Sequence, residues 1–355
     1  MIYAPVIIPT LNRLDHLKVC LESLSRCTWA DKTEVYIGLD FPPNAKYEDG
    51  YKQVKAYLDN CGNMGFKKLH IIKREKNYGV VQNFRSLQSL VFENCDRLIL
   101  CDDDIEFSPN FIQYMDMTLD RYNSDEEVVA VTGYAYPISW KVSNGATCLK
   151  QNLNGSDWGL GLWKEKYYAM SDYFYNGMLR KNLKRVIHDK SYKKMIDACK
   201  RDYILYACGI PHGNKDKDYW RLPVDVTVRC YLAIEDKYVI APIISKLKNH
   251  GFDGSGVVCD AITEFGDTAL TYDYEHQPID DSKTFSLIED ELQDDAKNRD
   301  ILNQFDIRTP NEMKRTLQLI WLCEHLGCWA GKMYERSLQP FDAILFRIKR
   351  YFQNS

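Results

Sequence analysis

Short runs of apolar residues recur along the first 135 residues of the chain, each about the length of one buried strand. Between these runs, apolar residues return every three or four positions, the spacing that places them on one face of a helix. The pattern predicts strands at residues 6–8, 35–39, 69–72, 97–101 and 128–131, and helices at 14–24, 47–58, 80–92 and 109–117. Strands that alternate with helices in this way indicate an α/β fold with a mostly parallel, doubly wound sheet.

This alternation ends near residue 137. A late apolar run at residues 238–244 predicts one more strand, in which Pro242 indicates a strand end or a sheet edge. Residues 260–306 are acidic, and residues 311–352 have a helical pattern. We therefore expect one domain over residues 1–258, with two halves at 1–137 and 138–258, and a mainly helical region over 259–355.

The composition is that of an ordinary globular protein, with 45% apolar and 27% charged residues in a chain of 355. A formal net charge of -4 argues against a nucleic-acid partner, because proteins of that class usually carry a basic excess. No apolar run reaches the roughly 18 to 20 residues that span a bilayer, and the N-terminus does not resemble a signal peptide. The 12 cysteines are scattered and form no Cys-x-x-Cys pair, which favours free thiols in a reducing cytoplasm.

Polar residues that follow the predicted strands are the first candidates for a binding site, because ligands of open α/β sheets lie beyond the carboxyl ends of the strands. The first strand–helix turn lacks G-x-G-x-x-G, and the chain lacks G-x-x-x-x-G-K-[ST], so neither a dinucleotide fingerprint nor a P-loop is present. The candidates are residues 10–13, Asp40, residues 74–77 and residues 102–104.

Three consecutive carboxylates, Asp102, Asp103 and Asp104, come directly after a predicted buried strand. Carboxylates this close repel one another unless a cation is present, and Mg²⁺ or Mn²⁺ takes carboxylate and phosphate oxygens together. The triplet therefore indicates a site where a divalent ion neutralises a diphosphate. The alternative is an acidic cluster that caps a helix or lies on the surface.

Five segments, taken in order, resemble the GT-A glycosyltransferases, above all glycosyltransferase family 2 and the N-acetylglucosaminyltransferase I type, including bacterial members that build surface polysaccharides. They are residues 6–13 (VIIPTLNR), residues 76–79 with Asn83, residues 102–111, residues 158–163 (WGLGLW) and residues 249–256 (NHGFDGSG). The resemblance covers about residues 3–258. It implies that residues 1–137 bind the nucleotide sugar and that residues 138–258 face the acceptor.

The resemblance also implies roles for single residues in donor binding. Asp40 would accept a hydrogen bond from the uracil N–H, although a turn residue ahead of Pro42 is an equal alternative. Asp104 would bind the Mn²⁺ or Mg²⁺ ion, and His250 is a possible further ligand, with loop packing as its alternative. The expected donor-binding residues are Thr10, Asn12, Arg13, Asp40, Asn77, Asn83, Asp102 and Asp103.

An inverting transferase needs a general base for the acceptor hydroxyl, on the side of the anomeric carbon away from the leaving diphosphate. Counted back from the segment at residues 249–256, Asp225 falls where relatives place this base, and Asp218 is the alternative. The apolar neighbours of Asp225 could raise its pKa by desolvation. The alternative is that Asp225 has a structural role and caps a helix.

Trp158, Gly159 and Trp163 belong to the segment that resembles an acceptor-side loop. Indole rings could stack on the C–H faces of a sugar, and aromatic core packing is the alternative for both tryptophans.

The function expected from the resemblance is metal-dependent, inverting transfer of a hexose or N-acetylhexosamine from a UDP-sugar to a glycan or lipid-linked saccharide acceptor. A sugar-phosphate nucleotidyltransferase and a non-catalytic carbohydrate-binding protein are the alternatives. An apolar stripe at Phe341, Ile344, Leu345, Ile348 and Phe352, with basic residues nearby, could contact an anionic membrane or pack against residues 311–327. The expected localisation is cytoplasmic, with possible peripheral contact at the inner face of the cell membrane.

Overall fold

The computed structural model describes most of the N-terminal half of the chain and selected parts of the rest. The chain divides into two compact units, one formed by Met1–Ala169 with Asp236–Ile307 and the other by Met170–Glu235 with Arg308–Ser355. The predicted domain boundary at residue 258 stays a prediction. The described residues are 2–136, 139–152, 156, 158–175, 228, 231–232, 235–251, 253, 255, 278–292, 318–319, 321–322, 325–327, 329–331, 333–334 and 336–337.

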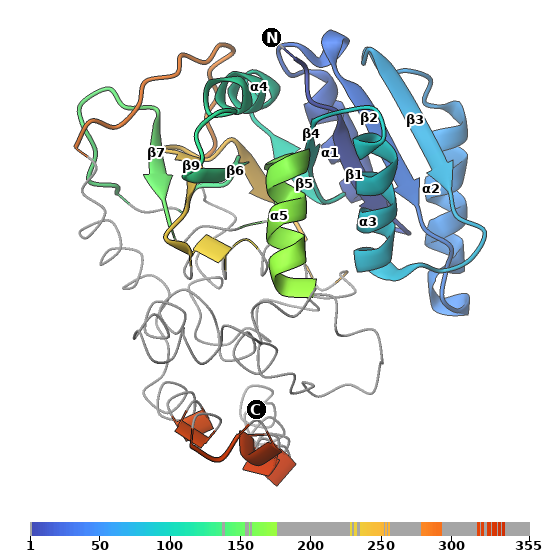
Figure 1. Ribbon diagram of the computed structural model, residues 1–355. Coiled ribbons are helices and arrows are strands. Elements are labelled where there is room, and N and C mark those ends of the chain that lie inside the picture. Colours follow the sequence, from blue (N-terminus) through green and yellow to red (C-terminus); the bar gives the residue numbers. More distant parts are fainter. Residues whose placement is uncertain are drawn as a thin grey trace, which may run out of the picture. The chain divides into compact units, whose positions relative to one another are not determined.

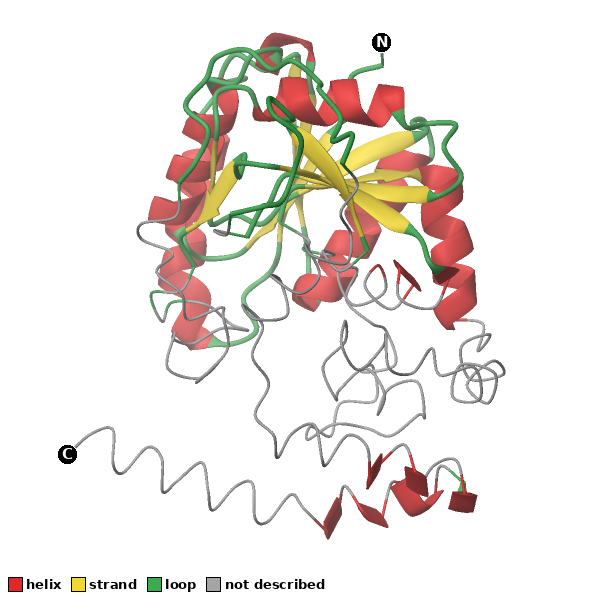
Figure 2. Cartoon of the chain, turned by 90° about the vertical axis from the view of Figure 1, so that its left-hand side faces the viewer, coloured by secondary structure: helices red, strands yellow, loops and turns green. Residues whose placement is uncertain are grey.

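The first half of the main sheet is parallel, as the alternating pattern predicted. Strands β1 (Val6–Thr10), β2 (Glu34–Leu39), β3 (Lys68–Lys73) and β4 (Arg97–Leu100) lie in the order β3-β2-β1-β4. Their connections are the helices α1 (Leu14–Ser25), α2 (Glu48–Asn60) and α3 (Gly79–Phe92), with short 3₁₀ turns at Ala30–Lys32 and Ala45–Tyr47. In Figure 2 the strands form a middle layer with helices on either side of it. Every residue of β1 and β4 is buried, which explains their unbroken apolar runs.

The second half of the sheet mixes parallel and antiparallel pairs. It contains β6 (Val128–Thr132), β7 (Cys148–Gln151), β8 (Leu160–Trp163) and β9 (Tyr238–Pro242), and the eight strands follow the order β3-β2-β1-β4-β8-β6-β9-β7. Strand β8 runs antiparallel to both β4 and β6, whereas β6 and β9 are parallel. The mixed α/β architecture thus confirms the expected fold class.

Strand β8 differs from the loop that the tryptophan and glycine pattern suggested. All four of its residues are buried, and it lies between two other strands in the sheet. Gly161 permits this placement, because a Cβ there would come within 2.8 Å of Met115 Cε. Helix α5 (Lys164–Tyr175) begins at the next residue after the strand.

A two-stranded antiparallel sheet stands beside the main one. It pairs β5 (Ile105–Phe107) with β10 (Leu247–Asn249), and helix α4 (Phe111–Arg121) follows β5. Strand β5 begins directly after the acidic triplet, so the small sheet leads straight to the candidate site.

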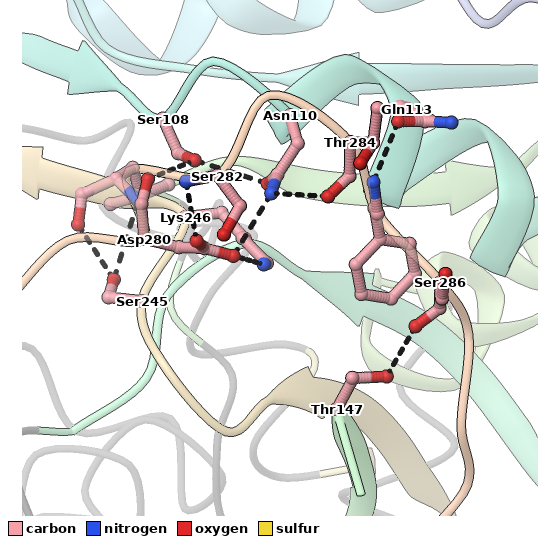
Figure 3. Close-up of polar contacts among 12 residues, drawn as sticks. Ser108, Asn110, Gln113, Thr147, Ser245, Lys246, Asp280, Ser282, Thr284 and Ser286 are labelled. Atoms are coloured by element: carbon pink, nitrogen blue, oxygen red, sulfur yellow. Dashed lines mark hydrogen bonds and ion pairs between the residues drawn. The ribbon is translucent and has the colours of Figure 1, made fainter. Parts of the chain in front are cut away.

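Residues 278–292, called the strap below, lie along the first unit although they come from the late, acidic part of the chain. Figure 1 shows the strap in orange, and Figure 3 shows its polar contacts in close-up. Isolated bridges join it to the rest of the unit at Ser245–Ile279 and Cys148–Glu289. Phe285 is buried edge-on against Tyr114, with ring centroids 5.0 Å apart. Within the described part of the chain, no helix has the length and apolar character needed to cross a membrane.

Candidate active site

The acidic triplet meets the turn after β1 at the carboxyl ends of two adjacent parallel strands. Thr10 Oγ1 donates a hydrogen bond of 2.6 Å to Asp103 Oδ2, and the Arg13 guanidinium pairs with the other oxygen of Asp103. The same Arg13 Nη2 lies 2.8 Å from Asp104 Oδ2. The sequence predicted this meeting, since parallel strands end at the same edge of a sheet.

Arg13 is the counter-ion of this acidic cluster. Burial works to lower its pKa, but the charges of Asp103 and Asp104 outweigh burial and raise it. Burial raises the pKa of Asp104, with Arg13 opposing that shift. Asp104 Oδ1 is buried and accepts no hydrogen bond from any residue that the structure describes. Within the described part of the chain, the cluster therefore holds one buried carboxylate oxygen without a hydrogen-bond donor.

The loop that follows β10 closes on Asp104 from the opposite side. The His250 backbone N–H donates to the Asp104 backbone oxygen at 2.8 Å. A Cβ at Gly251 would lie 2.1 Å from Asp104 Oδ2, so only glycine fits there. The His250 imidazole Nε2 lies within hydrogen-bonding distance of Glu106 Oε2, at 2.8 Å. Its predicted role as a metal ligand stays a prediction.

Asp40 holds the beginning of helix α3. Its Oδ1 accepts hydrogen bonds from the backbone N–H groups of Phe41 and Tyr78, at 2.9 and 2.8 Å. Its Oδ2 accepts from the Gly79 N–H at 2.8 Å and from Asn77 Nδ2 at 3.2 Å. These bonds occupy the four acceptor positions of the carboxylate. A contact with uracil, the predicted role of Asp40, requires that one of them be given up.

Asn83 is buried against the carboxyl ends of strands β2 and β3. It is 1% exposed, its Nδ2 donates to the Gly38 carbonyl at 2.7 Å, and its Oδ1 accepts from Arg74 Nε at 3.0 Å. Gly38 makes room for it, because a Cβ there would come within 2.6 Å of Asn83 Oδ1. Asn83 thus joins β2 to Arg74, and its predicted part in donor binding stays a prediction.

Two further donor-binding candidates lie at this edge of the sheet. Asn12 is half-buried, and its carbonyl faces helix α2, where a Cβ on Gly50 would approach it to 2.3 Å. Asn77 is exposed and spans to Asp40 and to the Phe41 carbonyl, with the latter bond at 2.6 Å. Both stay predictions as donor contacts.

The acceptor-side candidates divide between the sheet and a neighbouring turn. Trp163 is 3% exposed, and its indole N–H donates to the Leu119 carbonyl at 3.2 Å, so it is a core residue and not a sugar platform. Trp158 is half-buried and packs edge-on against Tyr134, with ring centroids 5.1 Å apart. Gly159 has φ of 63°, and a Cβ there would meet Leu247 at 2.5 Å, so its role is to let the chain turn in a packed place.

Three residues near the site were not assigned a role from the sequence. The Arg74 guanidinium lies over the Tyr78 ring at 4.9 Å, beside Asp40 at the end of β3. Glu106 pairs with His250 across the small sheet, and its alternation with buried neighbours in Ile105–Phe107 was the available signal. His16 Nε2 lies 3.0 Å from Asp253 Oδ2, a contact over 237 positions of sequence that no local pattern reveals.

The predicted general base cannot be located, since Asp225 and its alternative Asp218 lie outside the described residues. The predicted metal ion can be tested against the donor set. The unsatisfied Asp104 oxygen is the type of ligand that a hard divalent ion takes. Elsewhere the fit is incomplete, because no three side chains among the described residues come together as a metal-binding group.

Comparison with known proteins begins with a family model. Residues 6–181 match the model described as glycosyl transferase family 2. No curated protein sequence matches the chain. TarS of S. aureus has 15% identity and a TM-score of 0.33, with 49% of this chain and 30% of that chain covered. TarS 1–349 in complex with UDP-GlcNAc has 18% identity and a TM-score of 0.28, with 41% and 36% covered.

A third solved structure is aligned over nearly the whole chain. It is the mannosyltransferase PcManGT from Pyrobaculum calidifontis in complex with GDP-Man and Mn²⁺, at 11% identity and a TM-score of 0.37, with 99% of this chain and 81% of that chain covered. The alignments with TarS and with the UDP-GlcNAc complex of TarS 1–349, in contrast, span about a third of those chains. The family model, the mixed sheet and the acidic strand end agree. Residues 6–181 form a glycosyl transferase family 2 domain, and the mixed sheet agrees with the GT-A fold.

Proposed function

We propose that this protein transfers a hexose or an N-acetylhexosamine from a UDP-sugar to a hydroxyl group of a glycan, with inversion at the anomeric carbon. The observation that carries the proposal is the cluster of Thr10, Arg13, Asp103 and Asp104 at the ends of two adjacent strands, inside a family 2 domain. Such a cluster offers cationic and anionic groups side by side, as a nucleotide diphosphate with its counter-ion requires.

The divalent ion, Mn²⁺ or Mg²⁺, belongs to the proposal. Asp104 would hold it, and its remaining ligands would come from the donor and from water. When bound, such an ion stabilises the negative charge of a departing diphosphate. Arg13 would then be free to bind phosphate oxygens, for which its planar set of N–H donors is suited. Asp102 and Asp103 are proposed to bind sugar or ribose hydroxyls.

The base edge of the site is supported by a different group of contacts. Arg74 and Tyr78 form a flat, cationic surface at the end of β3, with Asp40 and Asn77 beside them. A uracil ring could stack there, and Asn77 offers amide groups to it. The proton of the acceptor hydroxyl is proposed to go to Asp225, with Asp218 as the alternative.

The acceptor is proposed to be a glycan or a lipid-linked saccharide of a surface polysaccharide. In the second unit, Trp321, Trp329 and Met333 are 53%, 67% and 59% exposed. Exposed tryptophans suit a membrane interface, and the predicted apolar stripe at 341–352, with its basic neighbours, suits anionic lipids. Sedimentation with anionic vesicles at low salt tests this contact. Protein that stays in the supernatant argues against peripheral attachment and leaves the cytoplasmic localisation as the prediction.

Thermal stabilisation by nucleotide sugars tests the proposed function. A ligand at about 100 times its dissociation constant adds about 2.7 kcal/mol to the free energy of unfolding. We expect one UDP-sugar, starting with UDP-GlcNAc, to raise the melting temperature with Mn²⁺ and to have less effect with a chelator. Stabilisation by no UDP-sugar, but by a nucleoside triphosphate with a sugar phosphate, would instead favour a nucleotidyltransferase.

A further inference from the structure

The small sheet β5–β10 joins the candidate site to the strap. At one end, Asp104 precedes β5 and His250 follows β10, and the His250 N–H bonds to the Asp104 backbone oxygen. At the other end, Ser108 follows β5 and Lys246 precedes β10, and the Ser108 N–H donates to the Lys246 carbonyl at 2.9 Å. A two-stranded sheet with strands of three residues has little stability alone. Its alignment must therefore come from contacts at its ends and faces.

Asp280 of the strap supplies contacts at the end remote from the site (Figure 3). Its Oδ2 forms an ion pair with Lys246 and accepts a hydrogen bond from Asn110 Nδ2 at 3.0 Å. Its backbone oxygen accepts a bond of 2.5 Å from Ser108 Oγ, and its N–H donates to the Ser245 carbonyl at 3.0 Å. One residue thus binds the end of β5, the beginning of β10 and the first turn of α4.

The ion pair between Lys246 and Asp280 is the strongest of these contacts, because the Lys246 ammonium is buried. The Lys246 side chain is 4% exposed, and its ammonium lies over the Phe285 ring at 4.9 Å. Burial lowers the pKa of Lys246, while its bond to Asp280 works to raise it. Burial works to raise the pKa of Asp280, but bonds from Asn110 and Lys246 outweigh burial and bring it to about 2. A buried ammonium without its carboxylate is strongly unfavourable.

We infer that Asp280 is a positioning residue for the glycosyltransferase site. It fixes Lys246 and Ser108, and the small sheet carries that alignment to the contact of His250 and Gly251 with Asp104. A small shift at the site end of the small sheet would disturb Asp104, since there is no room for even one methyl group between Gly251 and Asp104. The consequence for the site rests on the proposed function. Asp280 lies about 100 positions beyond the family match, so the family region alone lacks part of its support.

Asp280→Asn tests the inference, because it keeps the shape and removes the charge. The matched control is Asp281→Asn, the same substitution at the exposed neighbouring position. Hydrogen exchange is measured on peptides that cover residues 104–108 and 246–251, and on peptides from β1 and β2. Calorimetry measures the affinity for UDP with Mn²⁺. Ser108→Ala is a milder variant that removes one bond to Asp280 and leaves no unpaired charge, and it decides the matter if Asp280→Asn does not fold.

For Asp280→Asn we expect faster exchange in residues 104–108 and 246–251, with unchanged exchange in β1 and β2. We also expect weaker binding of UDP with Mn²⁺, by about tenfold to about 10²-fold, the size of effect that an ångström-scale misplacement produces. Ser108→Ala should change the same peptides less, and Asp281→Asn should match wild type. Exchange that rises equally in all peptides, or that stays unchanged in Asp280→Asn, overturns the inference. If wild-type protein binds no UDP, the proposed function fails, and the exchange data alone still decide the positioning role.

Discussion

Asp116 is a buried carboxyl group whose charge should make the protein less stable as pH rises. It lies on α4 with 0% exposure, and its Oδ1 accepts a hydrogen bond of 2.9 Å from the Ala4 N–H. Its Oδ2 is buried without a hydrogen-bond partner in the part of the chain that the structure describes. Burial raises the pKa of Asp116 to about 7, against the opposing effects of the Ala4 N–H and of Arg97. Asp116→Asn removes the charge and keeps an oxygen for Ala4.

The magnitude follows from linkage between folding and protonation. A folded-state pKa near 7 lies above the ordinary value of 3.8, so the folded protein holds the proton more tightly than the unfolded chain. The stabilisation is complete below about pH 4 and is lost as pH rises through 7. The difference of about 3 pKa units corresponds to about 4 kcal/mol in all, of which about 3 kcal/mol falls between pH 5 and 8.

Denaturant unfolding of wild type and Asp116→Asn at pH 5, 6, 7 and 8 measures this effect. We expect the variant to gain about 3 kcal/mol relative to wild type from pH 5 to pH 8. Other carboxylates titrate in both proteins, so the difference isolates Asp116. The control is Asp49→Asn, because that side chain is 92% exposed and its difference from wild type should not vary with pH. If the difference between wild type and Asp116→Asn is the same at pH 5 and pH 8, the carboxyl group is not protonated in the folded protein and the reasoning is wrong.

Three further substitutions test separate parts of the structure. Lys166→Met removes an ammonium that donates to three backbone carbonyls at 2.7 to 3.1 Å. In denaturant titrations it should lower the free energy of unfolding by about 2 to 3 kcal/mol, and a loss below about 0.5 kcal/mol contradicts this. Arg13→Gln should raise the affinity for Mn²⁺ in the absence of nucleotide by about tenfold or more, measured by paramagnetic resonance. The reason is that the Arg13 charge lies beside Asp103 and Asp104, and a positive charge about 5 Å from a divalent cation costs about 7 kcal/mol at an effective dielectric of about 20. Unchanged Mn²⁺ affinity would mean that Asp104 does not bind the ion. Gly251→Ala should abolish binding of UDP with Mn²⁺ without unfolding the protein, since its methyl group displaces the Asp104 carboxylate, and calorimetry with normal affinity would refute that contact.

The parallel half of the fold was predictable because each of its strands and helices shows its own pattern of apolar residues in the local sequence. Every residue of β1 and β4 is buried, and apolar residues fill both strands except for Thr10 at the end of β1 and Arg97 at the beginning of β4. The sequence placed Thr10 and Asp103 at strand ends on one edge of the sheet, and the pairing of β1 with β4 brings them into contact. Strand β8 was not predictable, because its burial depends on antiparallel neighbours and on Gly161 opposite Met115. The tryptophans and glycines of residues 158–163 are also typical of a loop, and the sequence was interpreted in that way.

The strap and the role of Asp40 depend on contacts between distant parts of the chain. Asp280 bonds to Lys246 and Asn110, which lie 34 and 170 positions away in the sequence. The polar sequence around Asp280 has no helical or strand periodicity that would indicate these contacts. Asp40 was placed correctly at a strand end, but three of its four hydrogen bonds come from residues 77–79, and the sequence does not reveal these contacts. Asn83 was assigned to donor binding by resemblance, whereas its burial follows from Gly38 on the facing strand.

Asp104 gives the most direct test of the central claim, that the acidic end of β4 is the donor site of a glycosyltransferase. The measurement is release of UDP from UDP-sugars with and without Mn²⁺, for wild type and for Asp104→Asn, at matched folded concentration. We predict Mn²⁺-dependent release by wild type from at least one UDP-sugar, and a loss of about 10²-fold or more in Asp104→Asn, because a neutral amide cannot replace a carboxylate that holds a divalent ion. Equal release by both proteins, or release that is indifferent to Mn²⁺, would contradict the account.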